Sequence, residues 1–133
     1  MLSSDSLKEI SNIFCGDTAD FYSYKQGYKL VEFFNTNFGT KDVYRSGFPS
    51  RWVYVHDKLV DLINSHQIDN FFNIVLGKSY LMQEQSLSEV EAAEKIETIY
   101  AEFNRIIHRD LCIITRNNGR YHLVKENDDL EPI

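Results

Sequence analysis

Residues 86–125 decide the fold and read SLSEVEAAEKIETIYAEFNRIIHRDLCIITRNNGRYHLVK. In the first part of this stretch, apolar side chains recur at helical spacing for about five turns. The segment Ser86-Leu87-Ser88-Glu89 stands in front of them and matches a capping box, which satisfies free amides of a first helical turn. The stretch therefore predicts a long helix with an apolar face at Val90, Ala93, Ile96, Ile99 or Tyr100, Phe103, and Ile106 or Ile107.

The second part of the stretch predicts an antiparallel hairpin. Two runs of β-branched and aromatic residues flank Asn118-Gly119, a pair suited to a type I′ turn because both central residues need positive φ. This turn places Ile114 opposite Leu123 and Ile113 opposite Val124. An isolated hairpin is marginally stable, so one of its faces must pack on helices.

The chain before residue 86 predicts further helices from the same period. A capping box at Ser6-Leu7-Lys8-Glu9 indicates a short first helix ending near Gly16, and Asp17 and Asp20 are suited to restart the chain. Three more helices are expected: from Tyr28 to a closing Gly39, from an N-cap at Ser50 to about Ser65, and from an N-cap at Asp69 to a closing Gly77.

These elements predict a mainly α protein, a single helical domain of five or six helices with a C-terminal β-hairpin. The domain is expected over residues 1–125, with the hairpin at about 111–125. Residues 126–133 are acidic and are interpreted as a tail or a linker to a further domain. A length of 133 residues leaves little room for a second core.

Composition narrows the class of protein. Hydrophobic residues make up 43% and charged residues 26% of the chain, values typical of a folded globular protein. The net charge of −6 makes nucleic acid an unlikely partner. Cys15 and Cys112 lack metal-ligand spacing and are interpreted as small buried hydrophobes, which favours a reducing compartment. With a polar N-terminus and no long apolar window, we expect a cytoplasmic protein without a membrane span.

The aromatic content of 14% is high and divides into two populations. Phe33, Phe34, Phe71, Phe72 and Phe103 fall on helical stripes and are expected in the core. The tyrosines and Trp52 concentrate instead around two irregular segments, 21–28 and 44–54. Because aromatic and arginine side chains dominate interaction hot spots, we predict a binding surface for a protein partner where these segments adjoin. Its candidate residues are Tyr22, Tyr24, Tyr44, Arg45, Phe48, Arg51, Trp52 and Tyr54.

Apart from one Arg-x4-His string, no motif of the sequence indicates a catalytic residue, and none indicates a cofactor or a metal. There is no nucleophile elbow, phosphate-binding loop, dinucleotide-binding glycine pattern or zinc-binding helix motif. The four histidines share no i, i+3 or i, i+4 spacing. His56 is expected in the core, hydrogen-bonded to a neighbour. The carboxylates of the long helix spread around its outer face and are interpreted as a solvated surface.

Two other functions remain as alternatives. The string Arg51-Trp-Val-Tyr-Val-His56 is similar to the R-x4-6-H motif of the HEPN ribonucleases, which implies a metal-independent ribonuclease using Arg51 and His56. Positions five apart in a regular helix point about 140° from each other, so this pair would need a distorted first turn. The weaker alternative is a single-stranded nucleic-acid binder that stacks bases on the Arg and Tyr side chains.

Residues 102–114, with the run Asn118-Gly119-Arg120-Tyr121, are similar to the segment that closes the N-terminal accessory domains of AbiJ-type bacterial abortive infection proteins. The stretch 51–77 resembles the middle helices of those domains. The chain departs from the family at Leu111-Cys112, where a glycine and an aromatic residue are usual. The resemblance implies a non-catalytic recognition or sensor module, in anti-phage defence, fused to an effector that is often a HEPN ribonuclease. The oligomeric state is left open.

Overall fold

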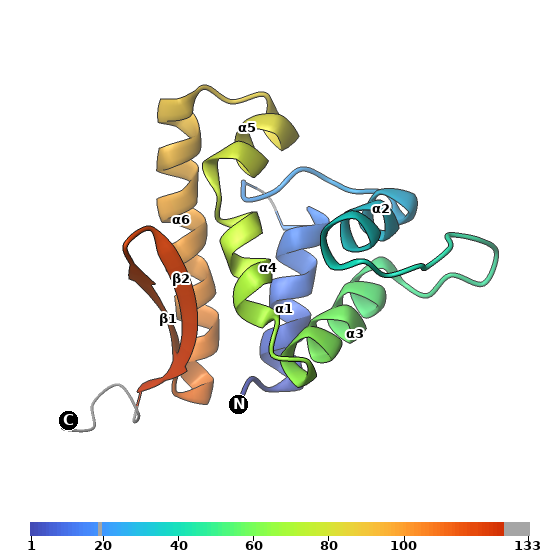
Figure 1. Ribbon diagram of the computed structural model, residues 1–133, viewed down its shortest axis with the longest axis horizontal. Helices are drawn as coiled ribbons and strands as arrows, with labels where there is room; N and C mark the ends of the chain where they lie inside the picture. The colour runs from blue at the N-terminus through green and yellow to red at the C-terminus, as the bar shows by residue number, and fades with distance from the viewer. Residues whose placement is uncertain (19, 127–133) are drawn as a thin grey trace.

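A computed structural model describes residues 1–18 and 20–126. Over these residues it confirms the expected fold class, six helices followed by a C-terminal antiparallel hairpin (Figure 1). The elements are α1 (Ser4–Cys15), α2 (Gly27–Phe38), α3 (Arg51–Asn64), α4 (Ile68–Val75), α5 (Lys78–Gln85), α6 (Glu89–Ile107), a 3-10 turn (His108–Asp110), β1 (Cys112–Asn117) and β2 (Arg120–Lys125). Residues 127–133 of the expected tail lie outside the described residues.

The helix starts differ from three predictions. Helix α1 is capped by Ser3, whose side chain accepts from the Ser6 amide, so the expected box at Ser6 is wrong. Helix α6 has a complete capping box, but Ser88 and Glu91 form it. The Ser-x-x-Glu pattern occurs twice in overlap here, and Ser86 instead closes α5 in the left-handed conformation. Helix α4 is preceded by Gln67, and Asp69 lies in its first turn.

Three further expectations are wrong. No helix restarts at Asp17, because the described residues of 16–26 form turns and extended chain. Gly77 does not close α4, because α4 ends at Val75 with Leu76 as its C-cap, and Gly77 is the N-cap of α5, a helix that the sequence did not predict. At the start of α6 the buried position is Ala92, whereas Val90 is exposed.

The hairpin has the register predicted from its turn. Ile114 pairs with Leu123 and Ile113 with Val124. Asn118 and Gly119 have φ values of 54° and 76°, as a type I′ turn requires.

Side chains from two helices complete the outer edges of this small sheet. Asn73 of α4 accepts from the Tyr121 amide at 2.8 Å and donates to the Tyr121 carbonyl at 2.9 Å. Asn104 of α6 does the same for Ile114, at 2.7 and 3.2 Å. Each asparagine thus takes the place of a neighbouring strand residue. The two-stranded sheet is held between α4 and α6 and is protected against pairing with other chains.

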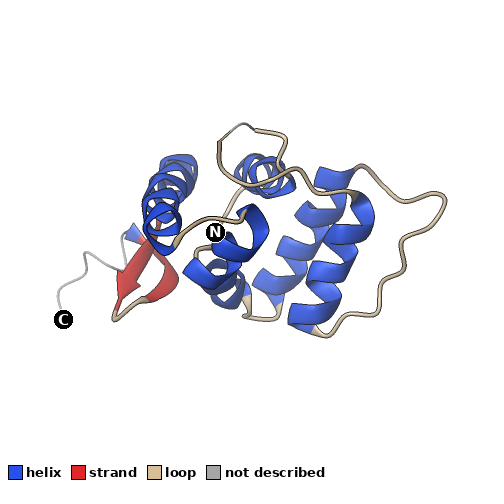
Figure 2. Cartoon of the chain, turned by 90° about the horizontal axis from the view of Figure 1, so that it is seen from above, coloured by secondary structure: helices blue, strands red, loops and turns tan. Residues whose placement is uncertain are grey.

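The core lies between the α6–hairpin side and the α2–α3 side of the molecule, with α1 and α4 in the middle (Figures 1 and 2). Phe14 of α1 is fully buried and contacts the rings of Tyr22, Phe33 and Phe71, with centroids 4.9 to 5.6 Å apart. The expected core residues Phe33, Phe34, Phe71, Phe72 and Phe103 are all buried. Tilted and edge-to-face contacts of this kind stabilise the packing beyond simple area burial.

Candidate interaction surface

The two irregular segments of the prediction adjoin at the start of α2. The rings of Tyr44 and Phe48, from the loop between α2 and α3, pack on each other in a tilted arrangement with centroids 4.8 Å apart. Both lie against Gly27, where a Cβ atom would be 2.3 Å from the Tyr44 ring and 3.2 Å from the Phe48 ring. Only a glycine leaves room for the Tyr44 ring in this position, so the loop is seated directly on the first turn of α2.

Arg51, the first residue of α3, joins the same two segments. Its guanidinium donates to the Lys25 carbonyl and to the Cys15 carbonyl, both at 2.6 Å, and pairs with Asp17 at 2.9 Å. The guanidinium also stacks on the Tyr24 ring at 4.0 Å. These contacts tie the end of α1 to the segment before α2 and fix the Tyr24 ring.

The base of the α2–α3 loop is anchored by Asp42. The Asn35 side chain donates to the Asp42 carbonyl at 2.9 Å and accepts from its amide at 3.0 Å. The Asp42 carboxylate pairs with Lys58 and accepts from the Tyr54 hydroxyl at 2.7 Å. The hydrogen bond from Lys58, helped by that from Tyr54, outweighs burial and lowers the pKa of Asp42. The backbone of the loop beyond Asp42 then projects outward (Figures 1 and 2), while the Tyr44 and Phe48 rings lie against Gly27.

Two of the candidate tyrosines are buried. Tyr22 packs edge-on against Phe14 and donates to the Val75 carbonyl at 2.7 Å. Burial raises the pKa of Tyr22 well above its ordinary value. Tyr54 packs under Phe48 with centroids 4.9 Å apart, and burial followed by the Asp42 hydrogen bond raises its pKa. Both rings support the loop segments from inside the protein.

The exposed candidates are Tyr24, Tyr44 and Arg45. The structure adds Tyr28 and Val43, which the sequence analysis did not single out, although Tyr28 ends one predicted segment and Val43 directly precedes the other. We call these five residues the aromatic surface. It holds four of the seven exposed large hydrophobic side chains of the described residues: Tyr24 (63% exposed), Tyr28 (48%), Val43 (63%) and Tyr44 (51%). Phe48 is partly buried beneath it.

Trp52 and His56 lie apart from this surface, on the side of α3 that faces α1. The Lys8 ammonium stands 4.6 Å from the Trp52 ring, and the His56 ring lies edge-on to it. His56 is partly buried, and its Nε2 atom is 3.1 Å from the Ser4 hydroxyl. Arg51 contacts the last residue of α1 and His56 the first, so the two side chains diverge. The geometry therefore gives no support to a ribonuclease dyad of Arg51 and His56.

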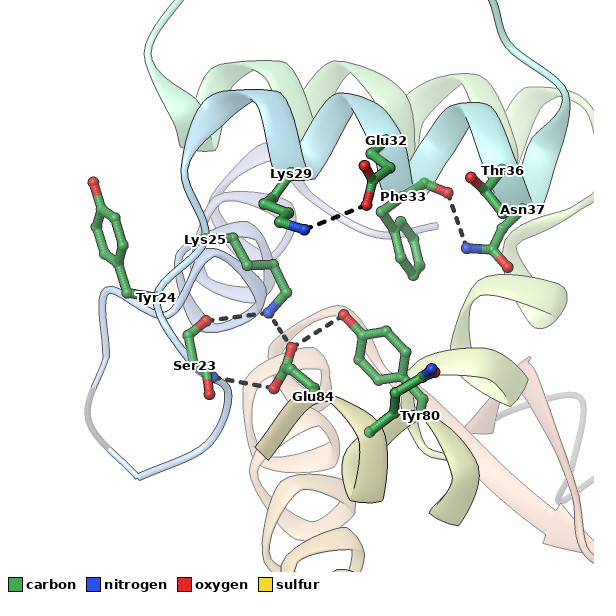
Figure 3. Close-up of a pocket in the computed structure, with 11 residues that line it drawn as sticks. Ser23, Tyr24, Lys25, Lys29, Glu32, Phe33, Thr36, Asn37, Tyr80 and Glu84 are labelled. Atoms are coloured by element: carbon green, nitrogen blue, oxygen red, sulfur yellow. Dashed lines mark hydrogen bonds and ion pairs between the residues drawn. The ribbon is translucent and has the colours of Figure 1, made fainter. Parts of the chain in front are cut away.

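A groove of about 610 Å³ runs between α2 and α5 and begins at Tyr24 (Figure 3). Its floor holds an ion pair between Lys25 and Glu84, both about nine-tenths buried. The Lys25 ammonium also donates to the Phe14 carbonyl at 2.9 Å and the Ser23 carbonyl at 3.2 Å. Glu84 accepts from the Ser23 amide and the Tyr80 hydroxyl, each at 3.1 Å.

These contacts give both charges on the groove floor partners within the protein. Burial lowers the pKa of Lys25, and the charge of Glu84 opposes that effect. Protein groups satisfy the polar atoms of the pair. The pair itself holds the segment before α2 against α5. Sequence reasoning missed both residues, because 59 positions separate them and neither belongs to a motif.

The described residues contain no group of three or more His, Cys, Asp and Glu side chains arranged to hold a metal ion. Cys15 and Cys112 are buried free thiols. Burial raises the pKa of Cys15 to about 11, so this thiol is protonated at neutral pH and is a poor nucleophile. None of the described helices is both long and apolar enough to cross a membrane.

Comparisons of the chain with protein-family models, with curated proteins and with solved structures find no match. The resemblance to AbiJ-type accessory domains therefore remains a prediction from the sequence. The function has to be inferred from the geometry of the surface itself.

Proposed function

We propose that this chain is a recognition module that binds a protein partner through the aromatic surface. The observation that carries the proposal is the concentration of exposed rings on segments that are fixed in place. Tyr24 is held by Arg51, and Tyr44 is seated on Gly27. Tyrosine offers a large amphipathic contact area with few rotatable bonds, so a rigidly mounted tyrosine loses little entropy on binding.

The length of the α2–α3 loop supports the same function. Residues 39–50 contain no helix or strand, and connections of this length in compact domains are commonly functional. Its base is secured at Asp42, whereas Val43, Tyr44 and Arg45 beyond it are exposed. A fixed base with an exposed apolar tip suits binding of a macromolecule.

The groove between α2 and α5 is a less suitable site for a small ligand. Its buried charges, Lys25 and Glu84, are already paired with each other and hydrogen-bonded to the protein. A ligand would have to replace these contacts without a gain. We therefore assign recognition to the aromatic surface and a structural role to the ion pair.

The resemblance to AbiJ-type accessory domains extends the proposal to a biological setting. On that basis the module acts in anti-phage defence, in recognition or regulation, beside an effector domain. The support for this setting is the similarity of residues 102–121 and 51–77 to those domains.

The test compares partners captured by three forms of the protein. The double variant Tyr24→Ser/Tyr44→Ser removes two exposed rings, and Val90→Ser removes an exposed apolar side chain far along the chain on α6. Val90→Ser should change stability by about 0.5 kcal/mol or less, as exposed substitutions usually do. The double variant also loses the contacts of Tyr24 with Arg51 and of Tyr44 with Phe48, so circular dichroism checks that each form is folded. We expect a protein captured by the parent and by Val90→Ser, but not by the double variant, and confirmed to bind directly after purification. Equal capture by all three forms would refute the proposal.

A nuclease assay checks the alternative function. We expect no RNA cleavage by the purified protein that depends on His56. Cleavage abolished by His56→Ala but retained in Tyr24→Ser/Tyr44→Ser would overturn the proposal in favour of the ribonuclease.

A further inference from the structure

The charge of the chain is unevenly distributed, and the aromatic surface lies in its basic part. Residues 21–51 contain five Lys and Arg residues but two acidic ones, Glu32 and Asp42, which gives a net charge of +3. The whole chain has a net charge of −6, so the remaining residues together carry −9. The segment that forms the aromatic surface is thus a basic region on an acidic protein.

Most charges of this basic region are compensated within the protein. Lys25 pairs with Glu84, Arg51 with Asp17 and Lys29 with Glu32. Asp42 is paired with Lys58 of α3. Both acidic side chains of the region therefore already have a cationic partner.

Two cations of the region have no acidic partner among the described residues. Lys41 and Arg45 are exposed, and neither forms an ion pair with any residue in ranges 1–18 and 20–126. In the sequence they stand before and after the segment that holds Val43 and Tyr44, the two exposed apolar residues of the loop. Residues 41–45 therefore carry two exposed apolar side chains between two cations that have no acidic partner among the described residues.

We propose that the aromatic surface binds an acidic, partly apolar peptide segment of its partner protein. An aliphatic or aromatic side chain of that segment packs on Tyr44 and Val43, and flanking Asp or Glu residues pair with Lys41 and Arg45. This inference rests on the proposed function and specifies the partner's chemistry. Complementary charge at the rim of an interface accelerates association and selects the partner, while the apolar centre supplies most of the affinity.

The apolar centre distinguishes this partner from a nucleic acid. Val43 offers no hydrogen bond or planar ring to a base, and the acidic remainder of the protein repels a long polyanion. A short acidic segment meets the local positive charge without extending over the acidic surface.

The experiment selects binders from a displayed library of random linear peptides against the full chain. Selected peptides are then synthesised, and their affinity is measured by fluorescence anisotropy at about 0.01 and 0.15 M ionic strength. The test variant is Lys41→Glu/Arg45→Glu. The matched control is Arg120→Glu/Lys125→Glu, which makes the same charge change on two exposed hairpin residues. Tyr44→Ser reports on the proposed function, and circular dichroism confirms that each variant is folded.

We expect the selected peptides to be enriched in Asp and Glu around an apolar residue, and to bind more weakly at the higher ionic strength. Reversing both charges should weaken binding about tenfold or more, while the hairpin control should match the parent.

One result would overturn the acidic-peptide inference alone: the selected peptides lack acidic residues and lose binding with Tyr44→Ser but not with Lys41→Glu/Arg45→Glu. Three results would overturn the proposed function as well. These are a selection without binders, binders insensitive to Tyr44→Ser, and single-stranded oligonucleotides that bind more tightly than any selected peptide and lose affinity when the two charges are reversed.

Discussion

Replacing Arg51 by Met is the most informative single change in this protein. Arg51 either holds the end of α1 and the segment before α2 together or forms half of a nuclease dyad. Methionine keeps an apolar stem beside Tyr24 but removes every donor. The variant loses two hydrogen bonds from a charged group, to the carbonyls of Lys25 and Cys15, and an ion pair with Asp17. Hydrogen bonds to charged groups contribute about 1.5–3 kcal/mol each.

The lower end of that range applies, because the Arg51 side chain is 21% exposed and the Cys15 carbonyl also accepts from the Lys25 amide. Two such bonds give about 3 kcal/mol, to which the solvent-screened pair with Asp17 adds a few tenths. We expect the free energy of unfolding, measured by urea denaturation, to fall by about 3 kcal/mol. The melting temperature should fall by roughly 10 °C. A loss below about 1 kcal/mol would refute the interpretation that Arg51 holds these two segments together.

A double-mutant cycle with His56→Ala separates the two interpretations. His56 has a polar contact with Ser4 at 3.1 Å and a longer one, at 3.4 Å, with the exposed Asp57 carboxylate, so its removal should cost about 1 kcal/mol. The α1 residues that Arg51 and His56 contact, Cys15 and Ser4, are about 16 Å apart along the helix axis, so the two losses should add within about 0.5 kcal/mol. A coupling energy above about 1 kcal/mol would show that Arg51 and His56 act as a unit.

Three other predictions concern the hairpin, an acid-sensitive cap and a thiol. Asn73→Ala removes both hydrogen bonds to Tyr121, so stability should fall by about 2 kcal/mol and the Tyr121 amide should exchange faster; unchanged exchange would contradict the edge role. Burial raises the pKa of Asp110, but hydrogen bonds from Ser6 and Ser3 outweigh it and leave the pKa below its ordinary value of 3.8. The ionised carboxylate therefore stabilises the fold above that value, and the benefit is lost as the pH falls through the depressed pKa. Asp110→Asn should cost about 1–2 kcal/mol at pH 7, and the same cost at pH 2 would argue against this account. Cys15 should react with a thiol reagent only at the rate of unfolding, and rapid labelling of the native protein would show that it is accessible.

Local sequence chemistry was sufficient for the hairpin and for most helix positions. The Asn118-Gly119 turn alone sets the register, because a two-residue type I′ turn allows one pairing of the flanking residues. Local patterns predicted the wrong N-cap where two Ser-x-x-Glu capping boxes overlapped. Ser86 and Ser88 each have a Glu three residues later, and only the αL backbone at Ser86, which ends α5, leaves Ser88 as the cap of α6.

The position of the aromatic surface could be predicted from the sequence, but which of its side chains are exposed could not. Aromatic composition indicated segments 21–28 and 44–54, and the structure brings them together at Gly27 and Arg51. It also places Tyr22 and Tyr54 inside the protein, while Tyr24 and Tyr44 remain exposed. An irregular segment has no fixed period, so its sequence does not indicate which side chains point into the core and which point into solvent.

The sequence by itself predicted five of the six helices, the hairpin and the aromatic core of the helices, because helical period and turn chemistry act between near neighbours in the chain. It did not predict α5, which is separated from α4 by Leu76 and Gly77. The tertiary structure alone decided which rings face solvent. It also decided which charges have an ion-pair partner among the described residues and which have none. Those properties depend on contacts between distant residues, such as Lys25 with Glu84 and Arg51 with Cys15. Such contacts arise only when the helices pack, so no local pattern of residues encodes them.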